Sequence, residues 1–572
     1  MPGSARMGTD ERAAAWQRLG SEHLDVLVVG GGVTGAGVAL DAATRGLKVA
    51  LVEARDLASG TSSRSSKLFH GGLRYLEQMN FGLVREALRE RDLMLTRIAP
   101  HLVKPVSFLY PLTHRLWERP YVGAGLLLYD TMGGGRSVPG HRHLTRTGAR
   151  KLAPALKRSA LTGALRYYDA QADDARHTLT VARTAVAYGA TVLNSAEVVD
   201  LVNAGERITG ARVRDVETGD EVEVRASVVV NATGVWTDAV QTLAGGRGQF
   251  HVRASKGVHI VVPRDRINSE TGLILRTEKS VLFVIPWTTH WIIGTTDTDW
   301  NLDLAHPAAS RADIDYLLDH VNEVLSVPLT HDDIQGVYAG LRPLLAGESE
   351  ETSQLSREHA VARPQPGLVA VAGGKYTTYR VMAADAVDMA RTDIARAVPD
   401  STTENIPLLG AEGYHAMVNQ AHTLADTYGV PVWQVERLLD RYGSLTTDVL
   451  ALADGDRSLL EPLDEAQEYL GVEFVYAASH EAALHLDDLL TRRTRVSIET
   501  PQRGVAVARR VAEIVAPLLG WDAVRADGEV AAYEARVEAE LEAQRQADDL
   551  SADASRVAAP DTRRLAVGRA LD

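Results

Sequence analysis

The stretch DVLVVGGGVTGAGVALDAATRGLKVALVEARD, residues 25–56, decides the fold of this chain. The apolar run at 26–29 is typical of a buried strand, and it leads into three glycines in GxGxxG spacing, Gly30, Gly32 and Gly35. The pattern then predicts a helix over about 34–45 and a second strand over 49–52, which ends in Glu53. Strand, helix, strand and an acidic residue about 20 positions after the glycines form the fingerprint of a dinucleotide-binding fold.

Each part of this fingerprint has a physical task. Gly30 permits a tight turn, Gly32 lets the backbone approach a pyrophosphate, and Gly35 allows close packing of the helix. The positive end of the helix faces the anion, and Glu53 is expected to accept hydrogen bonds from the adenosine ribose. A glycine motif alone is a weak signal, since glycine-rich turns occur in many α/β proteins. With all four parts in register, the sequence predicts dinucleotide binding.

Two later segments favour FAD over NAD as the dinucleotide. ASVVVNATGVW, residues 226–236, is a β-branched strand that runs into a turn of small residues, and residues 367–390 show a strand, a Gly-Gly turn and a helix. This order resembles the glutathione-reductase-like FAD proteins, in which the last helix points its positive end at the flavin. The resemblance implies cofactor contacts from Thr233, Gly234, Gly374, Lys375 and Thr377.

The segment that follows Glu53, ARDLASGTSSRSSKLFHGGLRYLE, is expected to continue the cofactor site. Its histidine, His70, would arrive near the isoalloxazine ring, with Gly71 and Gly72 letting the backbone lie against that ring. Its hydroxyl side chains are expected to bond the FAD phosphates: Thr61, Ser62, Ser65 and Ser66.

Seven motifs in one order make a more specific resemblance: SGTSSRSSKLFHGGLRYLE, NATGVW, SKGVHIVVPR, FVIPW, IIGTTDTD, GLRPLL and GGKYTTYR. From about residue 23 to 520 the chain resembles the FAD-dependent, quinone-linked glycerol-3-phosphate dehydrogenases. The resemblance implies oxidation of sn-glycerol 3-phosphate to dihydroxyacetone phosphate by hydride transfer to flavin N5. The electrons would then pass to a membrane quinone.

The charged residues of these motifs suit a phosphate ester. Arg342 and Arg74 are the candidate ligands of the phosphate dianion, with Lys375 as an added cation. Tyr75 is expected to orient the substrate by a hydrogen bond. Several cations favour a phosphate over the carboxylate that an amino-acid oxidase of this fold would bind, and a flavin-holding scaffold without chemistry would have no need of them together.

The proton of the substrate hydroxyl needs an acceptor with a pKa near neutral, which points to histidine. His70 is the first choice as base. His259 is the alternative, although its place in the alternating run VHIVV is more typical of a structural residue.

The electron acceptor stays open. No second glycine fingerprint for NADPH is found, but glycerol-3-phosphate oxidases, which use oxygen and release hydrogen peroxide, share this scaffold and most of these motifs. Acceptor choice depends on access to the flavin ring, on which the sequence is silent.

Composition bounds the remaining possibilities. The chain of 572 residues has no cysteine, so disulfides and thiolate ligands are excluded, and no metal site is predicted. The net charge of −14 argues against general nucleic-acid binding. The N-terminus lacks the order of a signal peptide and the most apolar stretch is too short to span a bilayer, so we expect a cytoplasmic enzyme on the inner face of the membrane.

The region 115–151 is rich in basic and aromatic residues, which fits either an interfacial helix on anionic lipid or a basic helix packed on the core.

The predicted fold class is α/β, a glutathione-reductase-like FAD-binding Rossmann domain with an antiparallel β substrate subdomain and an all-α C-terminal domain. The oxidoreductase region spans 23–398, with substrate or cap parts at about 101–174 and 246–354 and FAD-binding parts at about 23–100, 175–245 and 355–398. Residues 399–542 are expected to form the helical domain, which would pack or join two copies in a homodimer. Flexible ends are expected at 1–22 and 543–572.

Overall fold

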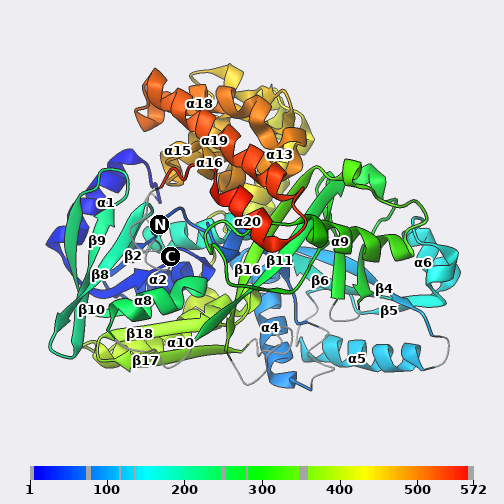
Figure 1. The fold of residues 1–572 in the computed structure, drawn as a ribbon, viewed down its shortest axis with the longest axis horizontal. Helices are drawn as coiled ribbons and strands as arrows, with labels where there is room; N and C mark the ends of the chain where they lie inside the picture. Colours follow the sequence, from blue (N-terminus) through cyan, green and yellow to red (C-terminus); the bar gives the residue numbers. More distant parts are fainter. Residues whose placement is uncertain are drawn as a thin grey trace.

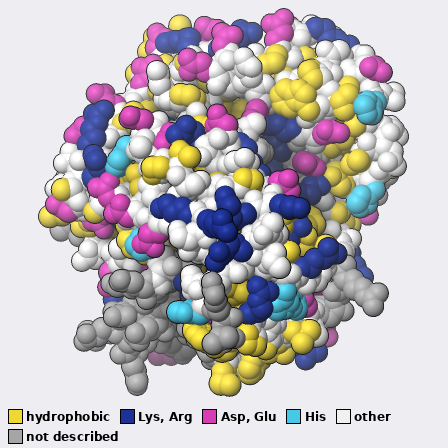
Figure 2. Space-filling view, turned by 90° about the vertical axis from the view of Figure 1, so that its right-hand side faces the viewer, with side chains coloured by type: hydrophobic (Ala, Val, Ile, Leu, Met, Phe, Trp, Pro, Cys, Tyr) yellow, Lys and Arg dark blue, Asp and Glu magenta, His cyan; other side chains and the backbone are white. Residues whose placement is uncertain are grey.

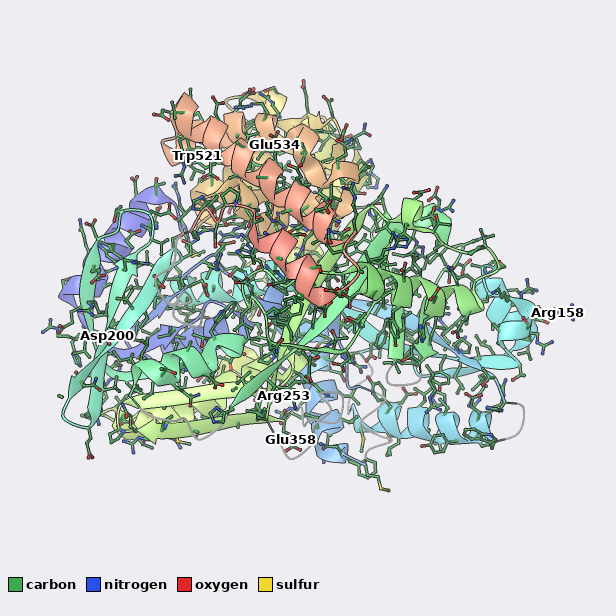
Figure 3. All side chains as sticks on the ribbon, viewed as in Figure 1. Arg158, Asp200, Arg253, Glu358, Trp521 and Glu534 are labelled. Atoms are coloured by element: carbon green, nitrogen blue, oxygen red, sulfur yellow. The ribbon has the colours of Figure 1, made fainter. Side chains whose placement is uncertain are left out.

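The computed structural model describes residues 5–72, 79–114, 117–133, 137–245, 251–277, 281–346 and 358–563. Figure 1 shows two β-sheets beside each other, with a helical region above them. Asp200 marks the end of the molecule at the first sheet and Arg158 the opposite end, while Trp521 and Glu534 lie in the helical region (Figure 3).

The first sheet carries the predicted dinucleotide fold. Its strands run in the order β17 (His359–Gln365), β18 (Leu368–Gly373), β10 (Glu221–Asn231), β1 (His23–Val29), β2 (Val49–Val52) and β7 (Thr191–Leu193). From β18 to β7 the neighbours are parallel, whereas β17 is antiparallel to β18. A meander of β8 (Ala196–Ala204) and β9 (Arg207–Asp215) joins the sheet at β10.

Three helices cover one face of this sheet. The predicted helix over 34–45 is confirmed as α2 (Val33–Thr44), which packs between α7 (Asp174–Ala187) and α10 (Tyr379–Ala390). The strands of a parallel sheet are buried on both faces, and accordingly all four residues of β2 are buried. Apolar side chains of these strands and helices share one core.

The second sheet is mostly antiparallel, as predicted for the substrate part. Its strands follow the order β15 (Thr298–Trp300), β11 (Val252–Pro263), β14 (His290–Gly294), β13 (Val281–Trp287), β12 (Gly272–Arg276), β4 (Lys104–Leu112), β6 (Gly163–Gln171) and β3 (Leu68–Phe69). Off this path, β16 (Gly336–Leu345) pairs with β11 and β5 (Arg142–Thr145) pairs with β6. Helix α9 (Arg311–Val324) packs on β11, β13 and β14. Helices α4 (Phe81–Leu93) and α5 (Glu118–Met132) lie together below this sheet in Figure 1.

The C-terminal region is helical apart from the short hairpin of β19 (Pro462–Leu463) and β20 (Ala466–Leu470). Its longer helices include α13 (Val432–Tyr442), α15 (Gly471–His480), α18 (Val505–Leu519) and α19 (Ala523–Ala543). Their apolar faces form two further cores.

Both flexible ends were predicted wrongly for the residues that the structure describes. Residues Thr9–Ser21 form helix α1, whose Arg12 binds Asp215 at 2.7 Å. At the other end, Asp549–Val557 form helix α20, and the guanidinium of Arg563 pairs with Asp488 at 2.7 Å. The N-terminus was expected to be loose because it lacks the order of a signal peptide, and the C-terminus because it is polar and alanine-rich. Ion pairs with partners far away in the sequence hold both in place.

Candidate active site

The glycine loop has the close approaches that the fingerprint predicts. Gly30 has a φ of +109°, and a Cβ on Gly35 would lie 1.9 Å from the Gly30 carbonyl oxygen. Gly32 is the N-cap of α2 and has no side chain to cap it. Ser62 Oγ accepts a hydrogen bond from Val33 N–H at 2.9 Å, and the first turn keeps further amide donors for an anion.

Glu53 closes the other side of this loop at the end of β2. Its Oε2 accepts from Gly31 N–H at 2.6 Å and its Oε1 from Arg55 N–H at 2.8 Å. Burial raises the pKa of the Glu53 carboxyl, and these two amides oppose the rise. Because a carboxylate has about four lone-pair sites, oxygens that hold the loop also remain acceptors for ribose hydroxyls. The donor set of amides beside one carboxylate fits FAD.

Of the four hydroxyl side chains predicted to bind the FAD phosphates, one lies at the glycine loop and three contact other parts of the protein. Ser62 caps α2 at the glycine loop, where an FAD-phosphate role remains a prediction. Thr61 Oγ1 donates to the Leu341 carbonyl at 2.6 Å, so its hydrogen is already engaged. Ser65 Oγ donates to Asp174 at 2.7 Å, and Ser66 Oγ lies 2.9 Å from His259 Nε2. These three hydroxyls join the loop to the rest of the protein.

A buried ion network anchors the same segment. Lys67 Nζ binds Asp174 Oδ1 at 2.7 Å, and that atom also accepts from Arg495 Nη2 at 2.5 Å. Arg495 reaches Asp173 at 2.6 Å as well. Burial is the main cause that lowers the pKa of Lys67, and the two aspartates oppose it. Removing one partner of such a network would leave an uncompensated buried charge, so the network fixes residues 65–67 against α7.

The His70 segment meets the GGKYTTYR segment directly. His70 N–H donates to Thr377 Oγ1 at 3.2 Å, and Lys375 Nζ donates to the Gly71 carbonyl at 3.5 Å. Lys375 is the N-cap of the short helix η8 (Tyr376–Thr378), which leads into α10. Two predicted parts of the site, 304 or more residues apart in sequence, are therefore neighbours.

His259 is buried on β11, with 2% of its surface exposed. Its ring stacks on Tyr338 with centroids 4.7 Å apart. Its Nδ1 has no hydrogen-bond partner among the described residues. Burial first, then the charges of Arg342 and Lys67, hold the pKa of His259 well below its usual value. His259 is therefore a neutral imidazole at pH 7.

Arg342 lies on β16 opposite Ser255 of β11. Its Nη2 donates to Thr295 Oγ1 at 3.1 Å and to the Thr296 carbonyl at 3.2 Å. Its Nη1 lies 3.5 Å from Asp297 Oδ1. With 19% of the side chain exposed, the guanidinium is held by polar groups while part of it stays accessible.

Phe283 lies between the segment that carries His70 and the strands that carry His259 and Arg342. Its ring lies 6.2 Å from that of His70, and in the sheet Gly294 pairs with both Phe283 and His259. A Cβ on Gly294 would lie 2.2 Å from the His259 ring. Cations, a neutral imidazole and small residues thus meet where the two sheets adjoin, an arrangement that can bind an anion and move a proton.

The other predicted site residues are distributed as follows. Thr233 Oγ1 donates to Asn231 at 2.7 Å at the end of β10, next to Gly234. Gly72 and Gly374 both have a φ of +80°. Arg74 and Tyr75 lie outside the described residues.

Three residues that support the site were missed from the sequence. Asp174 anchors Ser65 and Lys67, Tyr338 stacks on His259, and Asp297 holds Arg342. Asp297 belongs to the motif IIGTTDTD, so its motif was a usable signal. Asp174 and Tyr338 gave none, because their partners lie far away in the sequence.

Comparison with protein families and known proteins agrees with this geometry. Residues 25–384 match the FAD dependent oxidoreductase family, and residues 401–526 match the C-terminal domain of alpha-glycerophosphate oxidase. Glycerol-3-phosphate dehydrogenase 2 of Mycobacterium bovis is 66% identical over 560 residues, covering 98% of this chain and 96% of that protein. The mitochondrial glycerol-3-phosphate dehydrogenase of Homo sapiens is 37% identical, covering 88% of this chain and 71% of that protein.

A solved structure is also similar. The glycerol-3-phosphate dehydrogenase from Bacillus halodurans, complexed with FAD, superposes with a TM-score of 0.77 at 28% identity. The superposition covers 94% of this chain and 98% of that one. FAD is the cofactor of this fold.

Proposed function

We propose that this chain, which belongs to the FAD-dependent oxidoreductase family and within it to the glycerol-3-phosphate dehydrogenases, oxidises sn-glycerol 3-phosphate to dihydroxyacetone phosphate. One observation carries the proposal most. The Arg342 guanidinium and the neutral His259 imidazole lie together on adjoining strands, beside the segment that joins His70 to Lys375. When bound, FAD supplies the acceptor for the hydride that leaves C2 of the substrate.

Arg342 binds the substrate phosphate in this proposal. A guanidinium is planar and permanently charged, so it suits a phosphate dianion in a bidentate contact. Thr295 and Asp297 orient it. Lys375, held at the Gly71 carbonyl, adds positive charge near the reacting end of the substrate. Arg74 and Tyr75 keep their predicted roles as second phosphate ligand and orienting hydroxyl.

Two histidines compete for the role of proton acceptor. His70 was favoured by the sequence, but His259 lies where the charge of Arg342 acts on its ring, and we propose it as the base. In the tautomer whose Nε2–H donates to Ser66 Oγ, Nδ1 carries the free lone pair. A phosphate dianion on Arg342 would offset part of the positive charge that lowers the pKa of His259, so substrate binding would strengthen the base that it needs.

An anaerobic titration of the FAD-loaded protein with sn-glycerol 3-phosphate tests the substrate and the acceptor in one experiment. We expect the flavin absorbance to bleach, then to return rapidly on addition of a soluble quinone and slowly on addition of oxygen. A protein that does not bleach contradicts the substrate assignment. Rapid return with oxygen would instead make the enzyme an oxidase, the alternative that the family of residues 401–526 keeps open.

We further propose that α5 and the start of α4 rest on the inner face of the membrane, where a quinone would be reached. Of the helices that the structure describes, none is long and apolar enough to cross a bilayer. Large apolar side chains are exposed here instead: Trp117 at 54%, Tyr121 at 52%, Leu127 at 59% and Met79 at 75%. Figure 2 shows hydrophobic side chains at the lower edge of this end of the molecule, with basic ones above them.

Three of the predicted basic residues bond backbone carbonyls, which hold them in place and leave their charge unchanged. Arg119, Arg146 and Arg150 each donate to a backbone carbonyl, at 2.9, 2.8 and 3.3 Å, and Arg115 and Arg136 lie outside the described residues. Arg142 and Lys151 are exposed, so both charge and apolar area are available to an anionic lipid surface.

Replacing Trp117, Tyr121 and Leu127 together by serine is expected to weaken binding to anionic lipid vesicles about tenfold or more, because their apolar surface no longer enters the interface. Vesicle flotation measures this. Trp433→Ser is the matched control, since Trp433 is 48% exposed on α13 in the C-terminal region. Equal flotation of the triple variant and the control would contradict the lipid surface.

A further inference from the structure

A cavity lies between the loop 55–64, residues 305–309 and helices α19 and α20. Its volume is about 130 Å³, far above the roughly 10–15 Å³ that one water molecule needs. Its described lining includes neither the glycine loop nor His70, His259, Arg342 and Lys375. The cavity is therefore separate from the residues proposed to bind the substrate, although Tyr338, which stacks on His259, also lines it.

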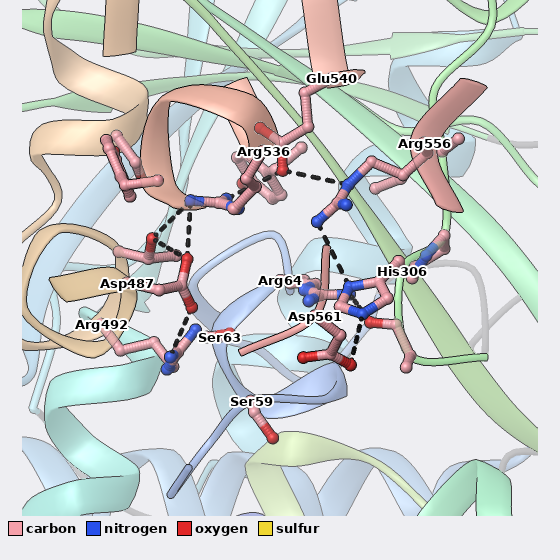
Figure 4. Close-up of a pocket in the computed structure, with 18 of the residues that line it drawn as sticks. Ser59, Ser63, Arg64, His306, Asp487, Arg492, Arg536, Glu540, Arg556 and Asp561 are labelled. Carbon is pink, nitrogen blue, oxygen red and sulfur yellow. Dashed lines mark hydrogen bonds and ion pairs between the residues drawn. The ribbon is translucent and has the colours of Figure 1, made fainter. Parts of the chain in front are cut away.

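The lining of this cavity is rich in arginine. Of the described residues that line it, eight are arginines and five are aspartates or glutamates. Figure 4 shows Arg64, Arg492, Arg536 and Arg556 around the same space, contributed by parts of the chain far apart in sequence. Arg495 and Arg563 are paired with carboxylates outside the lining, Asp174 and Asp488. The positive charge that can attract an anion is therefore centred on Arg64, and a concave site strengthens that attraction.

Carboxylates fix three of these guanidinium groups. Arg536 binds Asp487 at 2.8 Å and Glu540 at 2.9 Å, and Arg492 binds Asp487 at 2.8 Å. Arg556 lies 3.5 Å from Glu540. Such pairing positions the arginines before any ligand arrives, which lowers the cost of ordering them on binding.

Arg64 is different. Its contact to the protein is a hydrogen bond from Nη1 to the Ala305 carbonyl at 3.3 Å, and no carboxylate lies within ion-pair distance among the described residues. Burial, followed by the charges of Arg492, Arg556 and Arg536, lowers the pKa of Arg64 to about 9. The positive charge at this point exceeds what the neighbouring carboxylates neutralise.

We propose that this cavity binds a small phosphate-bearing anion, either free phosphate or a phosphate monoester, through Arg64 together with Arg536 and Arg556. Arginine is the side chain that best matches phosphate, because its donors form a planar fork. Ser59 and Ser63 lie on the opposite side of the cavity from Arg536 in Figure 4, where their hydroxyls complete a polar lining. Neither the fold nor the proposed oxidation requires this second site.

Calorimetric titration of the full-length, FAD-loaded protein with inorganic phosphate tests the proposal. The active site is also expected to bind phosphate, so Arg342→Gln is the starting protein, in which the cavity is intact. We expect it to bind phosphate, and we expect the added change Arg64→Gln to weaken that binding about tenfold or more, because a charge-assisted contact is lost. Arg509→Gln, at an exposed pair with Asp527, is the matched control and should change nothing.

The outcomes separate the cavity from the active site. Arg64→Gln in the otherwise wild-type chain should keep the KM for glycerol 3-phosphate. Titrating the Arg342→Gln protein with glycerol 3-phosphate as well distinguishes the ligand: binding of both identifies a site for monoesters, and binding of phosphate alone a site for the free ion. Failure of the Arg342→Gln protein to bind either ligand overturns the proposal. If the protein with Arg64→Gln does not retain FAD, Arg556→Gln is added to the Arg342→Gln protein instead. Phosphate binding that this second change does not weaken also overturns the proposal.

Discussion

Replacing Arg342 by glutamine is expected to lower kcat/KM for sn-glycerol 3-phosphate by roughly thirty- to a thousandfold, which corresponds to about 2–4 kcal/mol of transition-state binding. The loss should be mainly in KM, because the phosphate is held equally in the ground state and the transition state. Steady-state kinetics with a soluble quinone measure it. FAD content, from the flavin absorbance, shows whether the variant has kept its cofactor.

Two further variants make this prediction specific. Arg342→Lys keeps the charge but not the planar fork, so we expect it to recover only part of the lost affinity. Arg311→Gln changes an arginine that is 50% exposed and paired with Asp315, and should leave KM unchanged because a surface pair contributes little. A KM for Arg342→Gln within threefold of wild type would remove Arg342 from the phosphate site.

Local patterns account for the part of the fold that the sequence predicts well. The glycine loop is predicted from spacing: a Cβ on Gly30 or Gly35 would clash with a backbone oxygen, and one on Gly32 would come within 3.2 Å of Ser62 Oγ. The helix over about 34–45 and the strand over 49–52 follow from the same local pattern, and the structure has α2 and β2 there. Both features depend on neighbours close in the chain.

Contacts between distant residues account for what was missed. The sequence predicts a phosphate contact for Ser65, which stays a prediction, but it gives no sign of the bond from Ser65 to Asp174, 109 residues away. Helix α20 looked flexible by composition, yet Asp549 binds the buried Lys256 at 2.5 Å, across 293 residues. No local pattern predicts these two contacts, because neither partner differs in the sequence from an ordinary polar or charged surface residue.

Replacing His259 by asparagine is expected to lower kcat by about 10²–10⁴-fold, the range for loss of a general base. Asparagine keeps a hydrogen-bonding group for Ser66 but cannot accept the substrate proton. The same change at His70 should lower kcat less, because it keeps the backbone N–H that donates to Thr377. Anaerobic single-turnover bleaching of the flavin isolates the step, and a larger loss for His70→Asn than for His259→Asn would return the role of base to His70.

The pH dependence gives the same assignment a second test. Burial and the neighbouring cations hold the pKa of His259 well below the usual value of 6.5, and the active form of a base is the neutral one. As pH falls through about 6.5, where an exposed imidazole would take up a proton, kcat/KM should therefore stay level. Its decline should begin only at lower pH, and Arg342→Gln should move that decline to higher pH, because it removes a positive charge that lowers the pKa of His259. A decline centred at 6.5 that Arg342→Gln leaves in place would show that the titrating base is not His259.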